Sequence, residues 1–230
     1  MNILVTGANR GLGLSFIKLG VEKGYKMIAG IRGDKGKHED LLKVQAEYPD
    51  LVEIVNIDVS DEESIRQAKR VLEKLDLELD GLINNAGVLV DRGKKFDELD
   101  LDEGLLTFDI NTFGPIRVVK HMHALLKGED SFIVNISSDA GSIANTYDGD
   151  YFYGMSKSAL NMFSEKLNRA LKGVRVYSVH PGWLHTDMGG GQAPMSPDES
   201  ATCIYHLVEG KVETDPSHTY MNYKGEKFDF

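Results

Sequence analysis

Short runs of apolar residues alternate with amphipathic stretches along most of the chain. The apolar runs predict seven strands, at Asn2–Thr6, Lys26–Ile31, Val52–Asn56, Gly81–Asn84, Ser131–Ser137, Arg175–Val179 and Thr219–Met221. Continuous apolar strands that alternate with helices are typical of a parallel sheet buried on both faces. We therefore expect an α/β fold over residues 1–230: one Rossmann-type, doubly wound domain whose seven-stranded parallel sheet is flanked by helices on both faces.

A helical period is clearest after the third predicted strand. Ile65, Ala68, Leu72 and Leu75 repeat every three to four residues, and Ser60 stands three positions before Glu63. This spacing is typical of a capping box at a helix N-terminus. We expect a helix that begins just after Ser60 and buries the four apolar side chains.

One stretch, residues 181–197, shows neither period. It contains Gly182, three consecutive glycines from Gly189 and two further prolines, Pro194 and Pro197. Irregular loops of this length in compact domains are usually functional or disordered. We interpret it as a mobile loop over a substrate site, and a surface excursion without a role is the alternative.

Composition narrows the class of protein. The 230 residues are 41% hydrophobic and carry a formal net charge of −10, with a pI near 5.2. This is typical of a soluble globular protein, and an acidic surface repels phosphodiester backbones and anionic lipids. Nucleic acid and membrane are therefore not expected as partners.

The single cysteine, Cys203, excludes an intrachain disulfide and favours a reducing compartment. The first predicted strand starts at Asn2, so no secretory signal peptide is expected. No run approaches the roughly 18 apolar residues of a membrane helix. These features predict a cytoplasmic protein.

The first predicted strand runs into a glycine loop, Gly7-x-x-x-Gly11-x-Gly13, and a helix-period segment follows it. A helix N-terminus offers unpaired amides and a positive dipole end, and glycine allows a phosphate to approach the backbone. Glycines in an ordinary turn are the alternative. The strand–turn–helix context favours a dinucleotide-binding loop.

A second pattern suits proton transfer. Tyr153 and Lys157 lie four positions apart in a helix-period segment, so the ammonium is expected to stabilise the phenolate and lower its pKa. The same spacing occurs at Tyr220/Lys224 and Tyr223/Lys227, outside any helical pattern. A serine at the end of the preceding strand, Ser137 or Ser138, could polarise a carbonyl, and Ser142 is a weaker alternative.

Together these segments resemble the classical short-chain dehydrogenase/reductase superfamily. Thr6-Gly7-x-x-x-Gly11-x-Gly13, Asn84-Asn85-Ala86-Gly87, Ser138, Tyr153-x-x-x-Lys157 and Pro181-Gly182 occur in the order of that family and span nearly the whole chain. The run from Pro181 to Gly190 is especially similar to the carbonyl-reductase and C-factor-like (sniffer-type) branch. The resemblance implies a nucleotide-binding oxidoreductase.

The resemblance also implies roles for individual residues. It selects Ser138 over Ser137 and adds Asn111, in Phe108-Asp109-Ile110-Asn111, so that the implied catalytic residues are Asn111, Ser138, Tyr153 and Lys157. Asp58 would contact adenine, although it could equally be a turn residue before the next helix. The implied cofactor-binding residues are Gly7, Asn9, Arg10, Gly11, Leu12, Arg32, Asp58, Val59, Asn85, Ala86, Gly87, Tyr153, Lys157, Pro181, Gly182 and Thr186.

The end of the second strand indicates which nicotinamide cofactor is used. NAD-specific folds place a carboxylate there for the ribose 2′-hydroxyl, whereas this chain has Arg32, with Arg10 in the glycine loop. Guanidinium groups bind a 2′-phosphate in bidentate fashion. The sequence thus predicts NADP(H). Asp34 leaves NAD open if the strand ends later, and Arg32 could be a solvated surface charge.

The leading hypothesis is an NADPH-dependent carbonyl reductase whose partner is a small-molecule carbonyl or alcohol, such as an aldehyde, ketone or quinone. A non-catalytic NADP-binding sensor or C-factor-like signalling protein is the alternative. The histidines show no metal-ligand spacing, so no metal site is expected. The physiological substrate, the reaction direction and the oligomeric state (monomer, homodimer or homotetramer) stay open.

Overall fold

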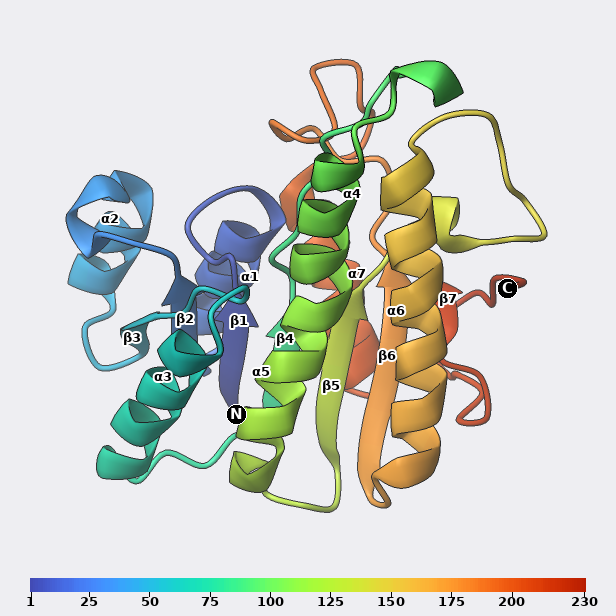
Figure 1. Ribbon diagram of the computed structural model, residues 1–230. Helices are drawn as coiled ribbons and strands as arrows, with labels where there is room; N and C mark the ends of the chain where they lie inside the picture. The colour runs from blue at the N-terminus through green and yellow to red at the C-terminus, as the bar shows by residue number, and fades with distance from the viewer.

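The computed structural model describes residues 1–230 and builds them around seven parallel strands in the order β3-β2-β1-β4-β5-β6-β7 (Figure 1). The strands are β1 (Asn2–Thr6), β2 (Lys26–Ile31), β3 (Val52–Asn56), β4 (Gly81–Asn84), β5 (Ser131–Ile136), β6 (Val174–His180) and β7 (Tyr220–Asn222). The first four match the predicted bounds. β5 ends one residue early, β6 is one residue longer at each end, and β7 is shifted by one residue.

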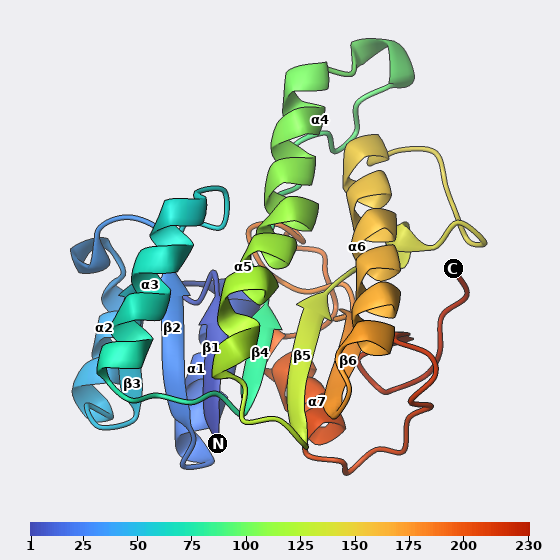
Figure 2. The ribbon, with the colours of Figure 1, turned by 60° about the horizontal axis from the view of Figure 1, so that its bottom comes forward.

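Helices cover both faces of the sheet, as expected (Figures 1 and 2). One face packs against α1 (Gly11–Glu22), α2 (Glu39–Glu47) and α7 (Pro197–Val208), and the other against α3 (Glu62–Lys74), α5 (Gly114–Met122) and α6 (Tyr151–Ala170). Side chains alternate along each strand, so that Ile3 and Val5 join one apolar cluster and Leu4 joins the other. The fully apolar strands follow from this burial on both sides.

Three consecutive helical segments form one long helix beside α6: α4 (Leu101–Phe108), the π-helical segment η3 (Asp109–Phe113) and α5. The remaining helical segments are short 3₁₀ helices: η1 (Lys35–Lys37), η2 (Phe96–Glu98), η4 (His123–Leu125) and η5 (Asp139–Gly141). None of the helices is both long enough and apolar enough to span a lipid bilayer.

The start of α3 differs from the prediction. Asp61, not Ser60, is the N-cap, and its carboxylate accepts the Glu63 amide at 2.9 Å. The Ser60 hydroxyl instead donates to Asp58 Oδ1 at 2.6 Å, in the preceding turn. At the other end the helix stops at Lys74, which leaves Leu75 48% exposed, whereas Ile65, Ala68 and Leu72 are buried as expected.

The irregular stretch after β6 is shorter than predicted, because Pro197 already begins α7. Ser196 caps this helix by accepting the Glu199 amide, and proline at the first helical position needs no amide partner. Residues 181–196 form a loop whose neck is closed by two backbone hydrogen bonds, from His185 to Met195 at 2.9 Å and from Met195 to Trp183 at 3.3 Å.

The strand order reverses next to β1, which lies between β2 and β4. The connections from β1 and β4 leave toward opposite faces, so a crevice opens at the carboxyl ends of these strands. Ligands of open α/β sheets bind at such a point. The fold therefore places the expected site above β1 and β4.

Candidate active site

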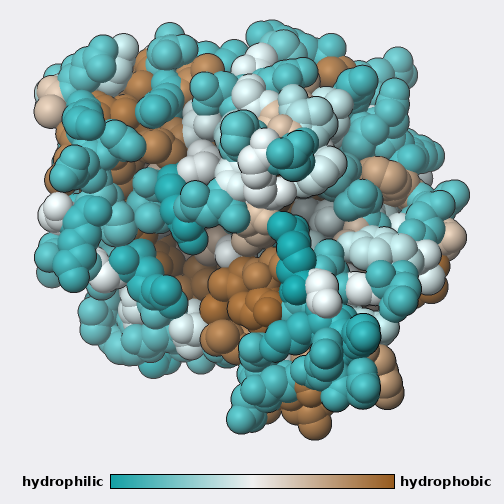
Figure 3. Space-filling model, turned by 90° about the horizontal axis from the view of Figure 1, so that it is seen from above, coloured by the Kyte–Doolittle hydropathy of each residue, from teal (hydrophilic) through white to brown (hydrophobic).

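A cleft of about 980 Å³ lies at the carboxyl ends of the strands. From above, the molecule is hollowed near its centre beside an apolar area, while most of the surrounding surface is hydrophilic (Figure 3). The loops after β1 to β6 all contribute to the lining. It includes every cofactor-binding residue expected from the sequence: Gly7, Asn9, Arg10, Gly11, Leu12, Arg32, Asp58, Val59, Asn85, Ala86, Gly87, Tyr153, Lys157, Pro181, Gly182 and Thr186.

The glycine loop forms one wall and requires its glycines. Gly7 and Gly11 have φ angles of +65° and +51°, in the left-handed region that other residues avoid. A Cβ at Gly13 would lie 2.2 Å from the Gly7 carbonyl oxygen. The first turn of α1 carries no acidic residue. Its free amides and dipole therefore fit the pyrophosphate of a dinucleotide.

Asn85 fixes this loop to β4. Its side-chain amide donates to the carbonyl oxygens of Thr6 and Gly7 at 2.9 and 3.2 Å, and the Thr6 hydroxyl accepts the amides of Asn85 and Ala86. The Asn85 side chain is thus engaged by the protein, and the backbone of Ala86 and Gly87 is left to face the cleft.

Two arginines mark the end of the cleft near β1 and β2. Arg10 and Arg32 are both exposed there, and Arg10 forms an ion pair with Asp187 of the 181–196 loop. Asp34, the residue that left NAD open, does not line the cleft, because its carboxylate caps η1 through the Gly36 amide at 2.9 Å. The two guanidinium groups are therefore the candidate partners for an anionic group at this end of the cleft.

Asp58 is a turn residue and also lies at the edge of the cleft. Its Oδ1 accepts the amide and the hydroxyl of Ser60, and Val59 beside it borders the cleft as well.

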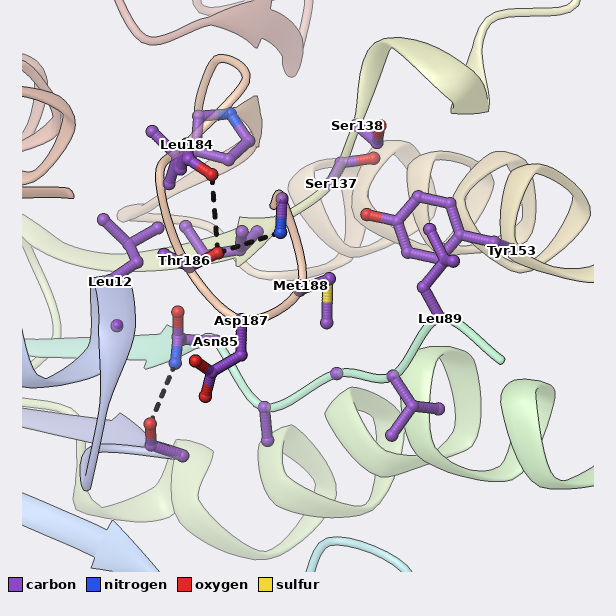
Figure 4. Close-up of a pocket in the computed structure, with 18 of the residues that line it drawn as sticks. Leu12, Asn85, Leu89, Ser137, Ser138, Tyr153, Leu184, Thr186, Asp187 and Met188 are labelled. Carbon is purple, nitrogen blue, oxygen red and sulfur yellow. Dashed lines mark hydrogen bonds between the residues drawn. The ribbon is translucent and has the colours of Figure 1, made fainter. Parts of the chain in front are cut away.

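On the opposite wall, Tyr153 extends from the first turn of α6. Its hydroxyl is directed into the cleft, close to Ser137 and Ser138 (Figure 4). Lys157, one turn along the helix, is 4% exposed, and its Nζ lies 5.5 Å from the centroid of the Tyr153 ring. The structure thus brings Ser138, Tyr153 and Lys157 together at one end of the cleft.

The pKa of Tyr153 moves in the direction opposite to our expectation. Burial raises it to about 12; the hydrogen bond with Ser138 and the charge of Arg92 oppose this rise, and the carboxylates of Asp139 and Asp150 add to it. Lys157 does not supply the expected stabilisation, because its own pKa of about 8 leaves the amine uncharged at the pH where the phenol ionises; its Nζ donates to the Ile136 carbonyl oxygen at 2.7 Å. Loss of hydration therefore outweighs the local stabilisation of the phenolate.

The pKa of Lys157 is lowered to about 8, and burial is the cause. The pKa of the amine is therefore close to neutral pH, where the group can both accept and release a proton. Such a group, beside a phenol in a cleft, is typical of sites that transfer protons.

Of the three candidate serines, Ser138 is the one at the cleft whose hydroxyl is not held by a partner in the core. Ser137 donates to Asn161 Oδ1 at 2.6 Å in the core, and Ser142 donates to the Asp229 carbonyl oxygen at 2.7 Å. Ser138 donates to the exposed Asp139 carboxylate at 2.9 Å and accepts the Ala140 amide. Its hydroxyl can therefore change partner without breaking a buried contact.

Asn111 is not part of the cleft lining. It is fully buried in the π-helical segment, where its amide accepts from the Val88 N–H and donates to the Val88 carbonyl oxygen, both at 2.8 Å, and donates to Ser156 at 3.1 Å. The helix departs from α-helical geometry at this residue. The side chain itself joins the loop after β4 to α6.

Two residues at or next to the cleft were not found from the sequence. Buried Asp91 accepts the Phe152 amide at 2.7 Å and so caps α6 one residue before Tyr153. Arg92 borders the cleft, donates to the Met188 carbonyl oxygen at 2.6 Å, and its charge opposes the rise in the pKa of Tyr153. Both lie in a loop without a motif, and the only signal was their position just after Asn84-Asn85-Ala86-Gly87.

Comparison with known proteins agrees with this geometry. A family model described as short chain dehydrogenase matches residues 1–196. The chain is 35% identical to the C-signal of Myxococcus xanthus over 151 residues. This alignment covers 64% of this chain and 90% of the C-signal. It is also 29% identical to a serine 3-dehydrogenase of Agrobacterium fabrum, with 96% and 90% coverage.

Solved structures match over the whole chain. The carbonyl reductase Sniffer of D. melanogaster has a TM-score of 0.91 at 29% identity, covering 100% of this chain and 99% of that one. The NADPH-bound carbonyl reductase from chicken fatty liver has a TM-score of 0.89 at 30% identity, covering 100% and 98%. A short-chain dehydrogenase/reductase from Burkholderia multivorans with bound NADP scores 0.88 at 27% identity, covering 100% and 99%.

Proposed function

Because the chain belongs to the short-chain dehydrogenase family, we propose that it is an NADPH-dependent carbonyl reductase acting on a small aldehyde, ketone or quinone. One observation carries the proposal: the Tyr153 hydroxyl points into the cleft beside Ser138, with the Lys157 amine one helical turn away. This arrangement provides a proton donor and a hydrogen-bond donor for one oxygen atom, which is what carbonyl reduction needs.

The cofactor supplies the hydride. The glycine loop would hold its pyrophosphate, and Arg10 and Arg32 would hold a 2′-phosphate, since no carboxylate at the end of β2 reaches the cleft. Two of the solved relatives hold NADP or NADPH, which supports the same choice.

In the proposed reaction, Ser138 donates a hydrogen bond to the substrate carbonyl oxygen and orients it. Tyr153 gives its hydroxyl proton to that oxygen as negative charge develops, and becomes a phenolate. The pKa of about 12 suits this direction, because the phenol is protonated at neutral pH and is still far more acidic than the product alcohol, so that proton transfer to the developing alkoxide is favourable. Lys157, whose pKa is about 8, lies close enough to help restore the proton.

The remaining parts of the cleft take supporting roles in the proposal. Residues 181–196 would cover the substrate, with Trp183 and Met188 on the cleft side. Asn111 would keep α6 and the loop after β4 in register, and its π-helical segment could hold a water molecule in the proton relay.

The test is a panel of aldehydes, ketones and quinones assayed for NADPH oxidation with the wild-type protein and Tyr153→Phe. We expect Tyr153→Phe to lower kcat by at least about a hundredfold and to leave the affinity for NADPH unchanged. Tyr151→Phe is the matched control, because its hydroxyl bonds Asp148 outside the cleft. A phenylalanine variant as active as wild type would exclude Tyr153 as the proton donor.

The cofactor choice has a separate test. Arg32→Ala should raise the Kd of NADPH about 10- to 100-fold and leave that of NADH unchanged, because only NADPH carries the 2′-phosphate. Fluorescence titration measures both constants. Tighter binding of NADH than of NADPH by the wild-type protein contradicts the proposal.

A second candidate is a non-catalytic NADP-binding signalling protein, which the 35% identity to the C-signal favours. The same panel separates the two. Tight NADPH binding without oxidation in the presence of any carbonyl supports the signalling function, and turnover that requires Tyr153 supports the reductase.

A further inference from the structure

Two side chains, one of them from the cleft lining, contact the peptide bond that follows Ser138. The Tyr220 hydroxyl, from β7, donates to the Ser138 carbonyl oxygen at 2.7 Å. Nδ1 of His180, at the end of β6, accepts the Asp139 amide at 3.0 Å. The C=O and N–H of a trans peptide point in opposite directions, so the two contacts hold this peptide from both edges.

We propose that Tyr220 and His180 are positioning residues that fix the Ser138–Asp139 peptide and thereby aim the Ser138 hydroxyl at the substrate oxygen; this rests on the proposed function. Ser138 ends a strand and begins η5, where its carbonyl oxygen accepts only one other bond, from the Gly141 amide at 3.0 Å. Without the two side chains, this peptide would keep only the hydrogen bond from the Gly141 amide.

Packing makes Tyr220 a rigid support. The residue is fully buried, its ring stacks on Phe228 with 5.2 Å between centroids, and Phe230 lies 5.6 Å away. The His180 ring meets the edge of the same Phe228 at 5.6 Å. The aromatic side chains thus lock both polar groups at fixed positions relative to β5.

Protonation states agree with the proposed roles. Burial raises the pKa of Tyr220, which keeps its hydroxyl a donor, and burial lowers the pKa of His180, which keeps Nδ1 an acceptor. Tyr220 belongs to one of the Tyr-x-x-x-Lys repeats outside the helical pattern. In the structure it serves the site through the backbone of Ser138 rather than through a lysine.

The test compares two buried tyrosines. Tyr220→Phe and Tyr205→Phe each remove one hydroxyl that donates to a backbone carbonyl oxygen, at 2.7 Å to Ser138 and at 2.6 Å to Phe16, and both residues are 0% exposed. Tyr205 lies in α7, on the opposite face of the sheet, and packs against Phe16 of α1. Both variants should lower the Tm by similar amounts.

Only Tyr220→Phe should affect catalysis. We expect kcat to fall about tenfold with little change in KM or in NADPH affinity, because the serine is misaligned while the binding groups stay in place. Tyr205→Phe should keep the wild-type kcat. Equal kcat values for the two variants would overturn the proposal.

A second readout does not depend on activity. Hydrogen exchange at the Asp139 amide should be faster in Tyr220→Phe and in His180→Ala than in Tyr205→Phe, because the clamped peptide is released. Unchanged protection of this amide contradicts the proposal even if the protein reduces no carbonyl. Absence of turnover with faster exchange would reject the reductase function and support the positioning.

Discussion

The two faces of the sheet differ in how many polar side chains they bury. The face that packs on α1, α2 and α7 is apolar, and its one fully buried polar aromatic side chain, Tyr205, bonds to the backbone of α1. Beneath α6, the opposite face contains buried amides and hydroxyls from both the strands and the helix. These residues are Asn84, Asn135, Ser137, Ser178, Asn161 and Ser164.

Side-chain hydrogen bonds connect this polar region, which runs directly below Ser138 and Lys157. Asn84 donates to Asn135, which donates to Ser164, each at 2.8 Å. Asn161 Oδ1 accepts both Ser137 and Ser178. Directional bonds fix geometry more tightly than apolar contacts, but each unmet partner is costly. We infer that the apolar face supplies most of the stability and the polar face supplies the precision of the site.

The largest expected effect is at Lys157, where stability and chemistry are opposed. Lys157→Met should lower kcat about 10³-fold and also raise the free energy of unfolding, because a buried amine with a lowered pKa destabilises the fold while it is charged. Denaturant titration and steady-state assays measure both. Lys166→Met, an exposed position on the same helix, should change neither.

The stability difference at Lys157 should depend on pH in a defined direction. Below about pH 8 the amine is charged in both the folded and the unfolded state, and the cost of burying it is complete. Between pH 8 and 10.5 the folded state loses the proton first, so wild-type stability rises with pH and the advantage of Lys157→Met shrinks. An advantage that grows over this range would contradict the assignment.

A smaller effect is expected when side-chain hydrogen bonds of the polar face are removed. Asn161→Leu should cost about 2–4 kcal/mol in the free energy of unfolding, because it strands the hydroxyls of Ser137 and Ser178 in the core. Adding Ser137→Ala and Ser178→Ala should recover much of the loss, since no buried donor is then left unpaired. A triple variant less stable than Asn161→Leu would show that packing, not hydrogen bonding, dominates here.

The smallest effect is expected on the apolar face. Ile204→Val, in the fully buried stripe of α7, should cost about 1 kcal/mol through lost apolar contact and leave kcat and KM unchanged. A clear loss of kcat in this variant would mean that the apolar face also controls the geometry of the site, and the contrast between the faces would fail.

The features predicted correctly from the sequence are those that short segments determine. Apolar runs located the strands. The glycine loop, Tyr153 and Lys157 lie in local patterns and Ser138 was selected by the family resemblance, and the structure places all of them in one cleft at the same edge of the sheet. The errors at Ser60 and Leu75 concern helix ends, where neighbouring polar residues compete for the same amides.

What the sequence did not reveal depends on distant partners. Tyr220 and Ser138 are 82 positions apart, and Asp91 and Phe152 are 61 apart. No periodicity links such residues, so only the folded chain brings them into contact. The direction of the Tyr153 pKa was predicted wrongly for the same reason, because spacing placed the lysine but could not tell how deeply the phenol is buried.

The π-helical turn at Asp109–Phe113 has a consequence for the length of the chain. Such a turn equals one extra residue within an α-helix, and each α-helical residue advances the helix by about 100°. The side of α4 that meets α6 and the side of α5 that meets α3 are therefore correctly phased only with this extra residue. A one-residue deletion in this segment is expected to rotate α5 so that it loses its packing against α3, even where substitution of the same residue is tolerated.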